Sequence, residues 1–186
     1  MQRHLLLAIA AVLVTLVAHP ADAQSRKPGN FRFGVGVGQV GLLGDPGSGG
    51  ANAIGFAGQI GYLLEESVAL DISYLRSSHS DVDHSSLNVG GDFYVGDYEA
   101  AYPHFTAGMS FINNRFKNIS IQGDAVGVYV GGGLDFELRP RLRLGPQLRF
   151  TKAFEAKANL NGKEIKTVQD SYSLLLRLVY TLGNDD

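Results

Sequence analysis

The chain has 186 residues and a formal net charge of −2, with 16 Lys and Arg against 18 Asp and Glu. A balance this close to neutral, without a polybasic tract, argues against a nucleic-acid partner. The sequence contains no Cys, which excludes disulfides and thiolate metal sites. A small exported domain without disulfides needs another source of stability.

Residues 1–23 have the layout of a secretory signal peptide. Arg3 gives the start a positive charge, an apolar run extends from Leu5 to Val17, and the small residue Ala23 stands at the expected cleavage point. The apolar run is shorter than the roughly twenty residues that a membrane-spanning helix needs. We therefore expect cleavage after Ala23, with residues 24–186 forming one exported domain.

From residue 31 onward the sequence alternates with a period of two, which is typical of strands with two unlike faces. In the stretch RLRLGPQLRF, for example, Arg143 and Arg149 share one parity, and Leu144 and Phe150 share the other. We find eight such runs. They cover residues 31–40, 54–63, 68–75, 87–95, 102–111, 126–136, 141–150 and 172–182.

The connections between these runs alternate in length. They are short after the second, fourth and sixth runs and long after the first, third, fifth and seventh. An even number of strands, with tight turns at one end and long loops at the other, is the plan of an outer-membrane barrel. Asn161–Gly162, in the last long loop, is a type I′ turn pair and predicts a hairpin above the membrane.

The distribution of charge indicates which face of the strands is wet. All six Lys and all six Glu lie outside the eight runs, although such side chains collect on the outer face of a soluble barrel. The positions on the polar side of each run are instead rich in Gly, Ser, Asp and Arg, and this composition suits a narrow barrel interior. We therefore expect the Leu, Val and Phe parity to face lipid, with backbone groups satisfied by barrel closure.

The expected interior carries four Arg and three Asp, which nearly balance. They are Arg32, Asp71, Asp92, Asp135, Arg143, Arg149 and Arg177. The uncharged helpers are Gln59, Asn88, His104 and Tyr129. Side chains just fill the interior of an eight-stranded barrel. We therefore predict that this set is a structural plug rather than an ion path.

The chain has eight alternating runs, an expected signal peptide and connections of alternating length. With these features, residues 30–182 resemble the OmpA/OmpX-type small outer-membrane β-barrels, including opacity-protein-like domains. The resemblance implies an all-β, eight-stranded antiparallel up-and-down transmembrane β-barrel. It also implies a monomer in the outer membrane of a Gram-negative bacterium, in contact with lipid and lipopolysaccharide. Members of this family do unlike things, so the fold alone does not give the function.

We expect a non-enzymatic structural or surface-interaction role through four long extracellular loops. The last loop offers basic side chains to lipopolysaccharide phosphates or to a surface ligand, although a solvated loop has the same composition. These side chains are Lys152, Lys157, Lys163 and Lys166. Two alternatives stay open: a narrow pore for ions or small solutes, and a soluble exported lipocalin-like barrel that binds an apolar ligand.

No catalytic, cofactor or metal site is expected. His104 and Ser110 share a parity but lie roughly 20 Å apart along an extended strand, too far to act as base and nucleophile. The second long loop contains side chains of the types that bind zinc or copper, but nothing in a Ser-rich loop fixes their geometry. These weak metal candidates are His79, Asp81, Asp83 and His84.

Overall fold

The structure is a computed structural model. It describes residues 27–43, 52–96, 101–117, 121–154, 157–160 and 163–182. The expected signal peptide, residues 1–23, lies outside these ranges. Among the described residues, no helix is long and apolar enough to cross a membrane.

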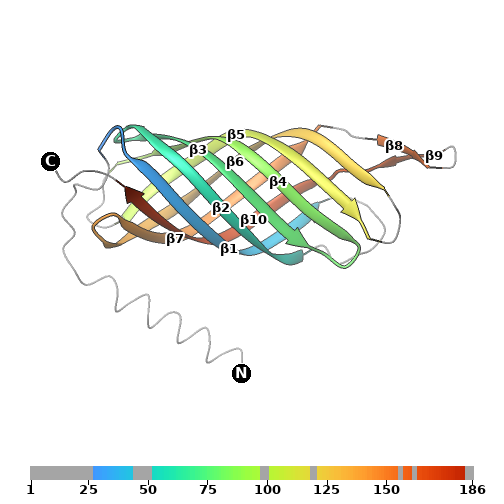
Figure 1. Cartoon of the computed structure of the whole chain (residues 1–186), viewed down its shortest axis with the longest axis horizontal. Coiled ribbons are helices and arrows are strands. Elements are labelled where there is room, and N and C mark those ends of the chain that lie inside the picture. Colours follow the sequence, from blue (N-terminus) through green and yellow to red (C-terminus); the bar gives the residue numbers. More distant parts are fainter. Residues whose placement is uncertain are drawn as a thin grey trace, which may run out of the picture.

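Eight antiparallel strands form one closed barrel, in the order β1-β10-β7-β6-β5-β4-β3-β2. They are β1 (Phe31–Leu43), β2 (Asn52–Glu65), β3 (Val68–Ser78), β4 (Val82–Tyr94), β5 (Ala101–Phe116), β6 (Gln122–Arg139), β7 (Leu142–Ala153) and β10 (Asp170–Leu182). Each strand pairs with its neighbour along the chain, and β1 pairs with β10 to close the ring (Figure 1). The predicted fold class is therefore confirmed.

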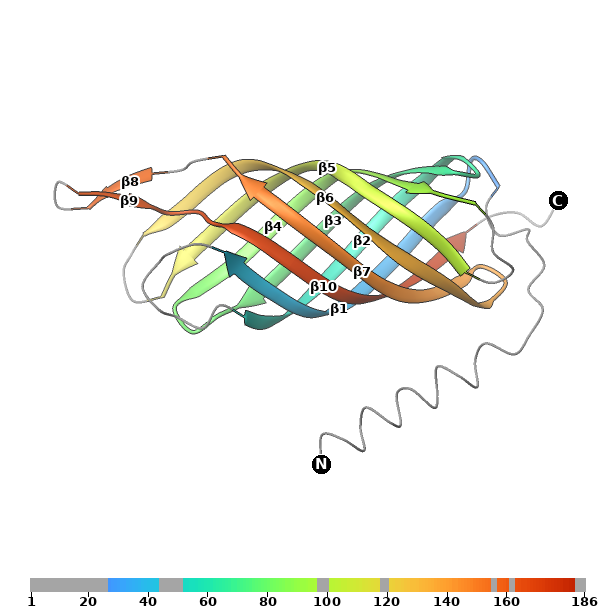
Figure 2. The ribbon, with the colours of Figure 1, turned by 180° about the vertical axis from the view of Figure 1, so that it is seen from behind.

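The remaining strands, β8 (Lys157–Leu160) and β9 (Lys163–Lys166), form a separate two-stranded sheet. They pair from Lys157↔Lys166 to Leu160↔Lys163, as the turn pair in the sequence predicts. Figures 1 and 2 show this hairpin projecting from one end of the barrel, opposite the short turns. We refer to these two ends as the loop end and the turn end.

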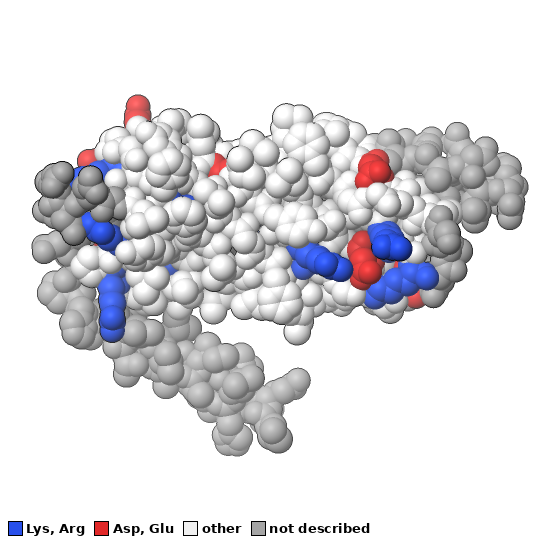
Figure 3. Space-filling view, viewed as in Figure 1, with Lys and Arg blue, Asp and Glu red and all other residues white. Residues whose placement is uncertain are grey.

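Burial alternates along the strands in the opposite sense to that of a soluble protein. On β3, Leu70, Ile72 and Tyr74 are about half exposed, whereas Asp71 and Ser73 are each 4% exposed. The exposed Phe, Leu, Ile, Val and Tyr side chains of the eight strands form an apolar belt around the barrel. Charged side chains gather toward the two ends in Figure 3, and most of the middle carries none. This is the surface that hydrocarbon requires.

The strands are longer than the apolar runs, and this corrects our expectation of four long loops. Residues 76–86 were expected to be a loop, but β3 continues to Ser78 and β4 begins at Val82, leaving only three residues between them. Likewise β5 continues to Phe116 and β6 begins at Gln122. Outside the apolar belt, the outward side chains are polar. The apolar alternation therefore stops there, although the strands continue to pair.

The turn end is closed by tight connections. Glu65 pairs with Val68 and Arg139 pairs with Leu142, each beside a shift in register. Arg141, in the second of these turns, has a φ of 74°, in the left-handed region that few residues other than Gly adopt. These turns connect the strands at the turn end, next to the charged side chains described below.

Candidate functional site: the charged barrel interior

All seven charged residues predicted for the interior are buried, and they divide into three groups. The largest group, which we call the central cluster, joins two arginines to three aspartates and one tyrosine. Its members are Arg32, Asp71, Asp92, Tyr94, Asp135 and Arg177. Arg143 and Arg149 lie outside this cluster, each with a different set of neighbours.

Asp92 stands at the middle of the central cluster, between two guanidinium groups. Its Oδ2 accepts from Arg32 Nη2 at 2.8 Å and from Arg177 Nη1 at 2.9 Å. Arg32 also forms a two-pronged ion pair with Asp71. Since Asp92 is fully buried, its charge depends on these two arginines rather than on water.

The central cluster extends across the barrel through Arg177 and Tyr94. Arg177 Nη2 donates to Asp135 Oδ2 at 2.8 Å, and Arg32 Nη1 donates to the Tyr94 hydroxyl at 2.6 Å. The Tyr94 hydroxyl in turn donates to Asp135 at 3.3 Å. One connected network therefore links β1, β3, β4, β6 and β10.

Three uncharged side chains complete the ring. Arg177 Nη1 lies 3.4 Å from Gln59 Oε1, and its Nη2 lies 3.1 Å from His104 Nε2. Gln147 Nε2 lies 3.3 Å from the same His104 nitrogen. Because a guanidinium can only donate, His104 accepts at Nε2. These contacts bring in β2, β5 and β7, so all eight barrel strands contribute to the network.

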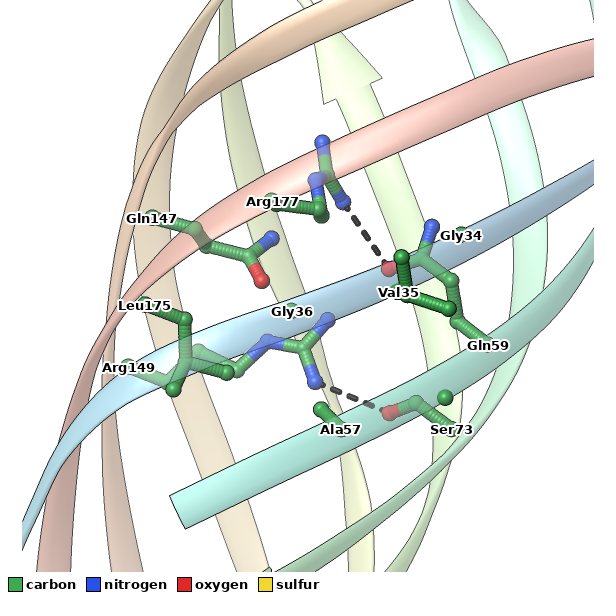
Figure 4. A pocket seen from close by; sticks show the side chains of 11 residues that line it. Gly34, Val35, Gly36, Ala57, Gln59, Ser73, Gln147, Arg149, Leu175 and Arg177 are labelled. Carbon is green, nitrogen blue, oxygen red and sulfur yellow. Dashed lines mark hydrogen bonds between the residues drawn. The ribbon is translucent and has the colours of Figure 1, made fainter. Parts of the chain in front are cut away.

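Arg149 was expected to pair with an aspartate, but the side chains that it contacts are uncharged. Its Nη1 donates to Ser73 Oγ at 2.9 Å, and its guanidinium lies 5.1 Å from the centre of the Tyr129 ring. Beside it lies a small cavity of about 10 Å³, bounded also by Gln147 and Arg177 (Figure 4). This volume is at the threshold for one water molecule.

Arg143 interacts with a residue that the sequence pattern missed. Its guanidinium lies 4.3 Å from the Tyr102 ring centre, and its Nε lies 4.0 Å from Glu137 Oε2. The Tyr102 hydroxyl donates to the same Glu137 oxygen at 2.8 Å. Our expectation that every Glu lies outside the strands was therefore wrong, because Glu137 is a buried residue of β6. Glu137 is two residues after Asp135 and so lies on the same inward side of the strand. This spacing would have predicted that it is an interior residue.

Glu137 completes the balance of charge inside the barrel. The four buried arginines now face four buried carboxylates, where the sequence analysis counted only three. A closed, low-dielectric interior tolerates charges only when they are paired and hydrogen bonded. The described interior is formally neutral, which is what this condition requires.

Glycines make room for these large side chains. A Cβ on Gly61 would lie 2.2 Å from Asp71 Oδ1 and 2.7 Å from Arg32 Nε. A Cβ on Gly34 would lie 2.6 Å from Gln59 Cγ. By contrast, a Cβ on Gly58 would have no neighbour within 4 Å. The high glycine content therefore has a steric function inside the barrel.

The loop end of the interior is packed by a different set of residues. Thr167, Val168 and Gln169, which follow β9, are all nearly inaccessible to solvent, although we expected this stretch to be a surface loop. Val168 packs with Ile112 and Ala153 in a small apolar cluster. We call residues 167–169 the mouth segment, because they pack against inward residues of β5, β6 and β7 near the loop end.

The histidines of the expected second loop serve this end as structural groups. His84 is buried and its Nδ1 lies 2.8 Å from Asn114 Oδ1, while Asn114 Nδ2 donates to the Thr167 carbonyl at 3.4 Å. His79 lies 3.0 Å from Ser77 Oγ. Within the described part of the chain, no three His, Cys, Asp or Glu side chains group as metal ligands. The weak candidates His79, Asp81, Asp83 and His84 thus form no such group.

The basic side chains proposed for loop contacts are only partly described. Lys152 is an outward residue of β7, not of a loop, and its Nζ lies 2.7 Å from Asp170 Oδ2. The backbones of Lys157, Lys163 and Lys166 lie in the β8–β9 hairpin, but their side chains are outside the described part of the structure. The positive charge of Lys152 is therefore already compensated by a neighbour.

The decisive comparison is with protein families. The model of the outer membrane protein beta-barrel domain matches residues 8–183. The chain belongs to this family. It is accordingly an outer-membrane protein of a Gram-negative bacterium, and the soluble lipocalin-like alternative is excluded. No curated protein is similar enough in sequence to count as a relative.

Solved structures with the same fold have little sequence in common with this outer-membrane barrel. Neisserial surface protein A is 15% identical with a TM-score of 0.64, covering 82% of this chain and 97% of its own. The N-terminal barrel domain of Pseudomonas aeruginosa OprF is 16% identical with a TM-score of 0.61, covering 84% and 100%. Ail of Yersinia pestis is 15% identical with a TM-score of 0.56, covering 83% and 99%.

Proposed function

We propose that this outer-membrane protein is a non-enzymatic, monomeric barrel with a plugged polar lumen that displays extended hairpins at the cell surface. The observation that carries the proposal is the connected network around Arg177, to which all eight barrel strands contribute. A solute crossing the barrel has to separate these buried ion pairs. Separating them leaves desolvated charges without partners, which costs several kcal/mol.

The mouth segment supports the same proposal from the loop end. A solute that entered from outside would meet Val168, which is fully buried against Ile112 and Ala153. The central cluster lies further along the barrel toward the turn end. Two successive obstructions of different chemistry therefore stand in the path, one apolar and one ionic.

The contacts of His104, the strand histidine considered above as a base, support a non-enzymatic role. His104 is buried, and its Nε2 is occupied by Arg177 and Gln147. Within the described part of the chain, no Ser or Thr hydroxyl forms a hydrogen bond with its ring. A base needs its nucleophile within hydrogen-bond reach, and this histidine is instead held in the network.

The surface role rests on the strands that extend beyond the apolar belt and on the β8–β9 hairpin. The hairpin carries Lys157, Lys163 and Lys166, which suit an anionic surface ligand. A structure of Ail was solved in complex with the heparin analogue sucrose octasulfate. We propose the same chemical class, a sulfated or phosphorylated glycan, for this hairpin.

Solute uptake by liposomes separates a plug from a narrow pore. Liposomes containing the folded protein are diluted into isotonic solutions of small sugars, and swelling is followed by light scattering. We expect the same rate as for empty liposomes, and a rate that falls with solute size would show a pore.

For the surface role, the triple variant K157Q/K163Q/K166Q should lose retention on immobilised heparin, whereas Lys152→Gln should keep it.

A further inference from the structure

The outer wall of the β3–β4–β5 hairpins carries three cations directly above the apolar belt. Strand register places Tyr74, Leu87 and Phe111 side by side in the last apolar row. One outward row higher, Arg76 lies beside Ser85, and Ser85 lies beside Asn113. Two rows higher, Ser78 pairs with Asp83, and Asp83 pairs with Arg115.

Lys117 completes this group from the end of β5. Its Nζ donates to Ser78 Oγ at 2.9 Å and to the His79 carbonyl, and it lies 3.4 Å from Asp83 Oδ1. We call Arg76, Arg115 and Lys117 the cationic patch. Figure 3 shows blue and red side chains together at the loop end of this wall.

Two of the three cations in the patch have no ion-pair partner among the described residues. Asp83, which stands above the apolar belt, has its pKa lowered by a hydrogen bond from Ser78 and further by Lys117 and Arg76. Among the described residues, the guanidinium groups of Arg76 and Arg115 form no ion pair. Asp81 and Asp124 are also near the loop end, but in the described part of the chain neither forms an ion pair with Arg76 or Arg115. The wall therefore presents two guanidinium groups whose N–H donors are not used in an ion pair with any described residue.

The opposite wall at the same end is different. There the cation Lys152 is paired with Asp170 at 2.7 Å. Around it, the outward polar side chains Gln39, Asn52 and Tyr172 are neutral and bond to one another. Among the described residues at this end, the two outward arginines without an ion-pair partner therefore lie on one side of the barrel, and the paired lysine lies on the other.

We propose that the cationic patch binds the phosphate groups of an outer-leaflet glycolipid, namely the lipid A part of lipopolysaccharide. Its side chains have outward parity, so they point sideways into the membrane's headgroup layer rather than upward into the medium. They begin one row above the last apolar side chains, where headgroup phosphates lie. Arginine matches phosphate through paired N–H donors, and lysine adds a point charge.

A shallow hollow beside the patch suits the same ligand. It has a volume of about 370 Å³ and is lined by Phe111 and Val126 on one side and by Asn113 and Asp124 on the other. Asn113 donates to Asp124 at 2.5 Å, so the polar side is internally bonded. The hollow thus crosses the boundary between acyl chains and sugars, as a glycolipid does.

The test uses the full-length folded protein in detergent micelles and purified lipid A as the probe. Binding is measured for the wild type, for R76Q/R115Q and for Lys152→Gln, whose cation is paired on the opposite wall. We expect the double variant to bind about tenfold more weakly or worse, and Lys152→Gln to bind like the wild type. Equal binding by all three proteins would overturn the proposal.

Two further probes separate the possible sources of phosphate. Dephosphorylated lipid A should bind the wild type as weakly as intact lipid A binds R76Q/R115Q, and undiminished binding would mean that acyl contacts alone are responsible. Inorganic phosphate should compete only weakly with lipid A. If it binds as tightly, the patch is a site for free phosphate and not for a glycolipid. Liposome swelling on the same variants is independent of these outcomes, so a failure here leaves the plugged lumen untouched.

Discussion

The two halves of the barrel interior are packed by different kinds of contact. Toward the turn end, buried ions from many strands contact one another, with Asp92 held between Arg32 and Arg177. Toward the loop end, the mouth segment packs against the wall, with Val168 in apolar contact with Ile112 and Ala153. In the proposed plug, the strands themselves supply the first obstruction, and a separate stretch of chain supplies the second.

This difference indicates where a substitution should lower the free energy of unfolding most. Removing one partner of a buried ion pair leaves the other charge uncompensated, which is costlier than deleting a methyl group. The mouth segment contributes through packing and a few hydrogen bonds, so its loss should be felt locally. The turn half should respond as a unit, and the loop half should respond residue by residue.

Asp92→Ala should give the largest effect. It leaves Arg32 and Arg177 without their shared acceptor, and we expect the free energy of unfolding to fall by about 3–5 kcal/mol. Urea titration of the folded barrel in lipid vesicles measures this. The matched control is Asp83→Ala, a partly exposed aspartate of the same strand, expected to cost less than about 1 kcal/mol. Similar losses from both variants would mean that the central cluster has no special weight.

Gly61→Ala should come next. Its Cβ would collide with Asp71 and Arg32, and overpacking of this kind costs about 1–3 kcal/mol. Gly58→Ala, on the same strand but facing outward into open space, is the control and should leave stability almost unchanged. The same titration compares them, and a loss for Gly58→Ala as large as that for Gly61→Ala would contradict the steric account.

Val168→Ala should have a smaller and local effect. Deleting two buried methyl groups should cost about 1–2 kcal/mol. Hydrogen exchange read by mass spectrometry should become faster for amides around the mouth segment, Ile112 and Ala153. Amides around Asp92 should exchange at their former rate. Faster exchange throughout the barrel would show that the two halves are coupled, contrary to the comparison above.

Tyr102→Phe should have the smallest measurable effect. It removes the 2.8 Å hydrogen bond to Glu137 but keeps the aromatic ring against Arg143, so we expect a loss of about 1–2 kcal/mol. Tyr180→Phe, on the lipid-facing side of β10, provides the comparison and should cost less. If the two substitutions cost the same, the hydroxyl of Tyr102 adds nothing to the Arg143 group.

The fold was predictable because the lipid imposes a simple pattern. Apolar side chains must face outward within the belt, so residues such as Leu70 and Ile72 reveal both the strand and its orientation. The same reasoning placed Arg32, Asp92 and Arg177 on the inward parity. Parity alone, however, says nothing about which arginine meets which carboxylate, since partners come from strands far apart in sequence.

The errors arose where that pattern ends. Glu137 was missed because the sixth run was ended at Phe136, where apolar alternation stops although the strand continues. The hairpin over residues 76–86 was taken for a loop because its outward residues are polar. The burial of Val168 is a tertiary effect, since a single valine between Thr and Gln carries no periodic signal.

Electrical recording from planar lipid bilayers tests the central claim most directly. The folded wild-type protein is inserted into a bilayer in symmetric salt, and current is measured over a range of voltages. A closed interior predicts no steady current above that of the bare bilayer. Stable, ohmic current steps from the wild type would contradict it, because ions would then be passing the cluster around Asp92.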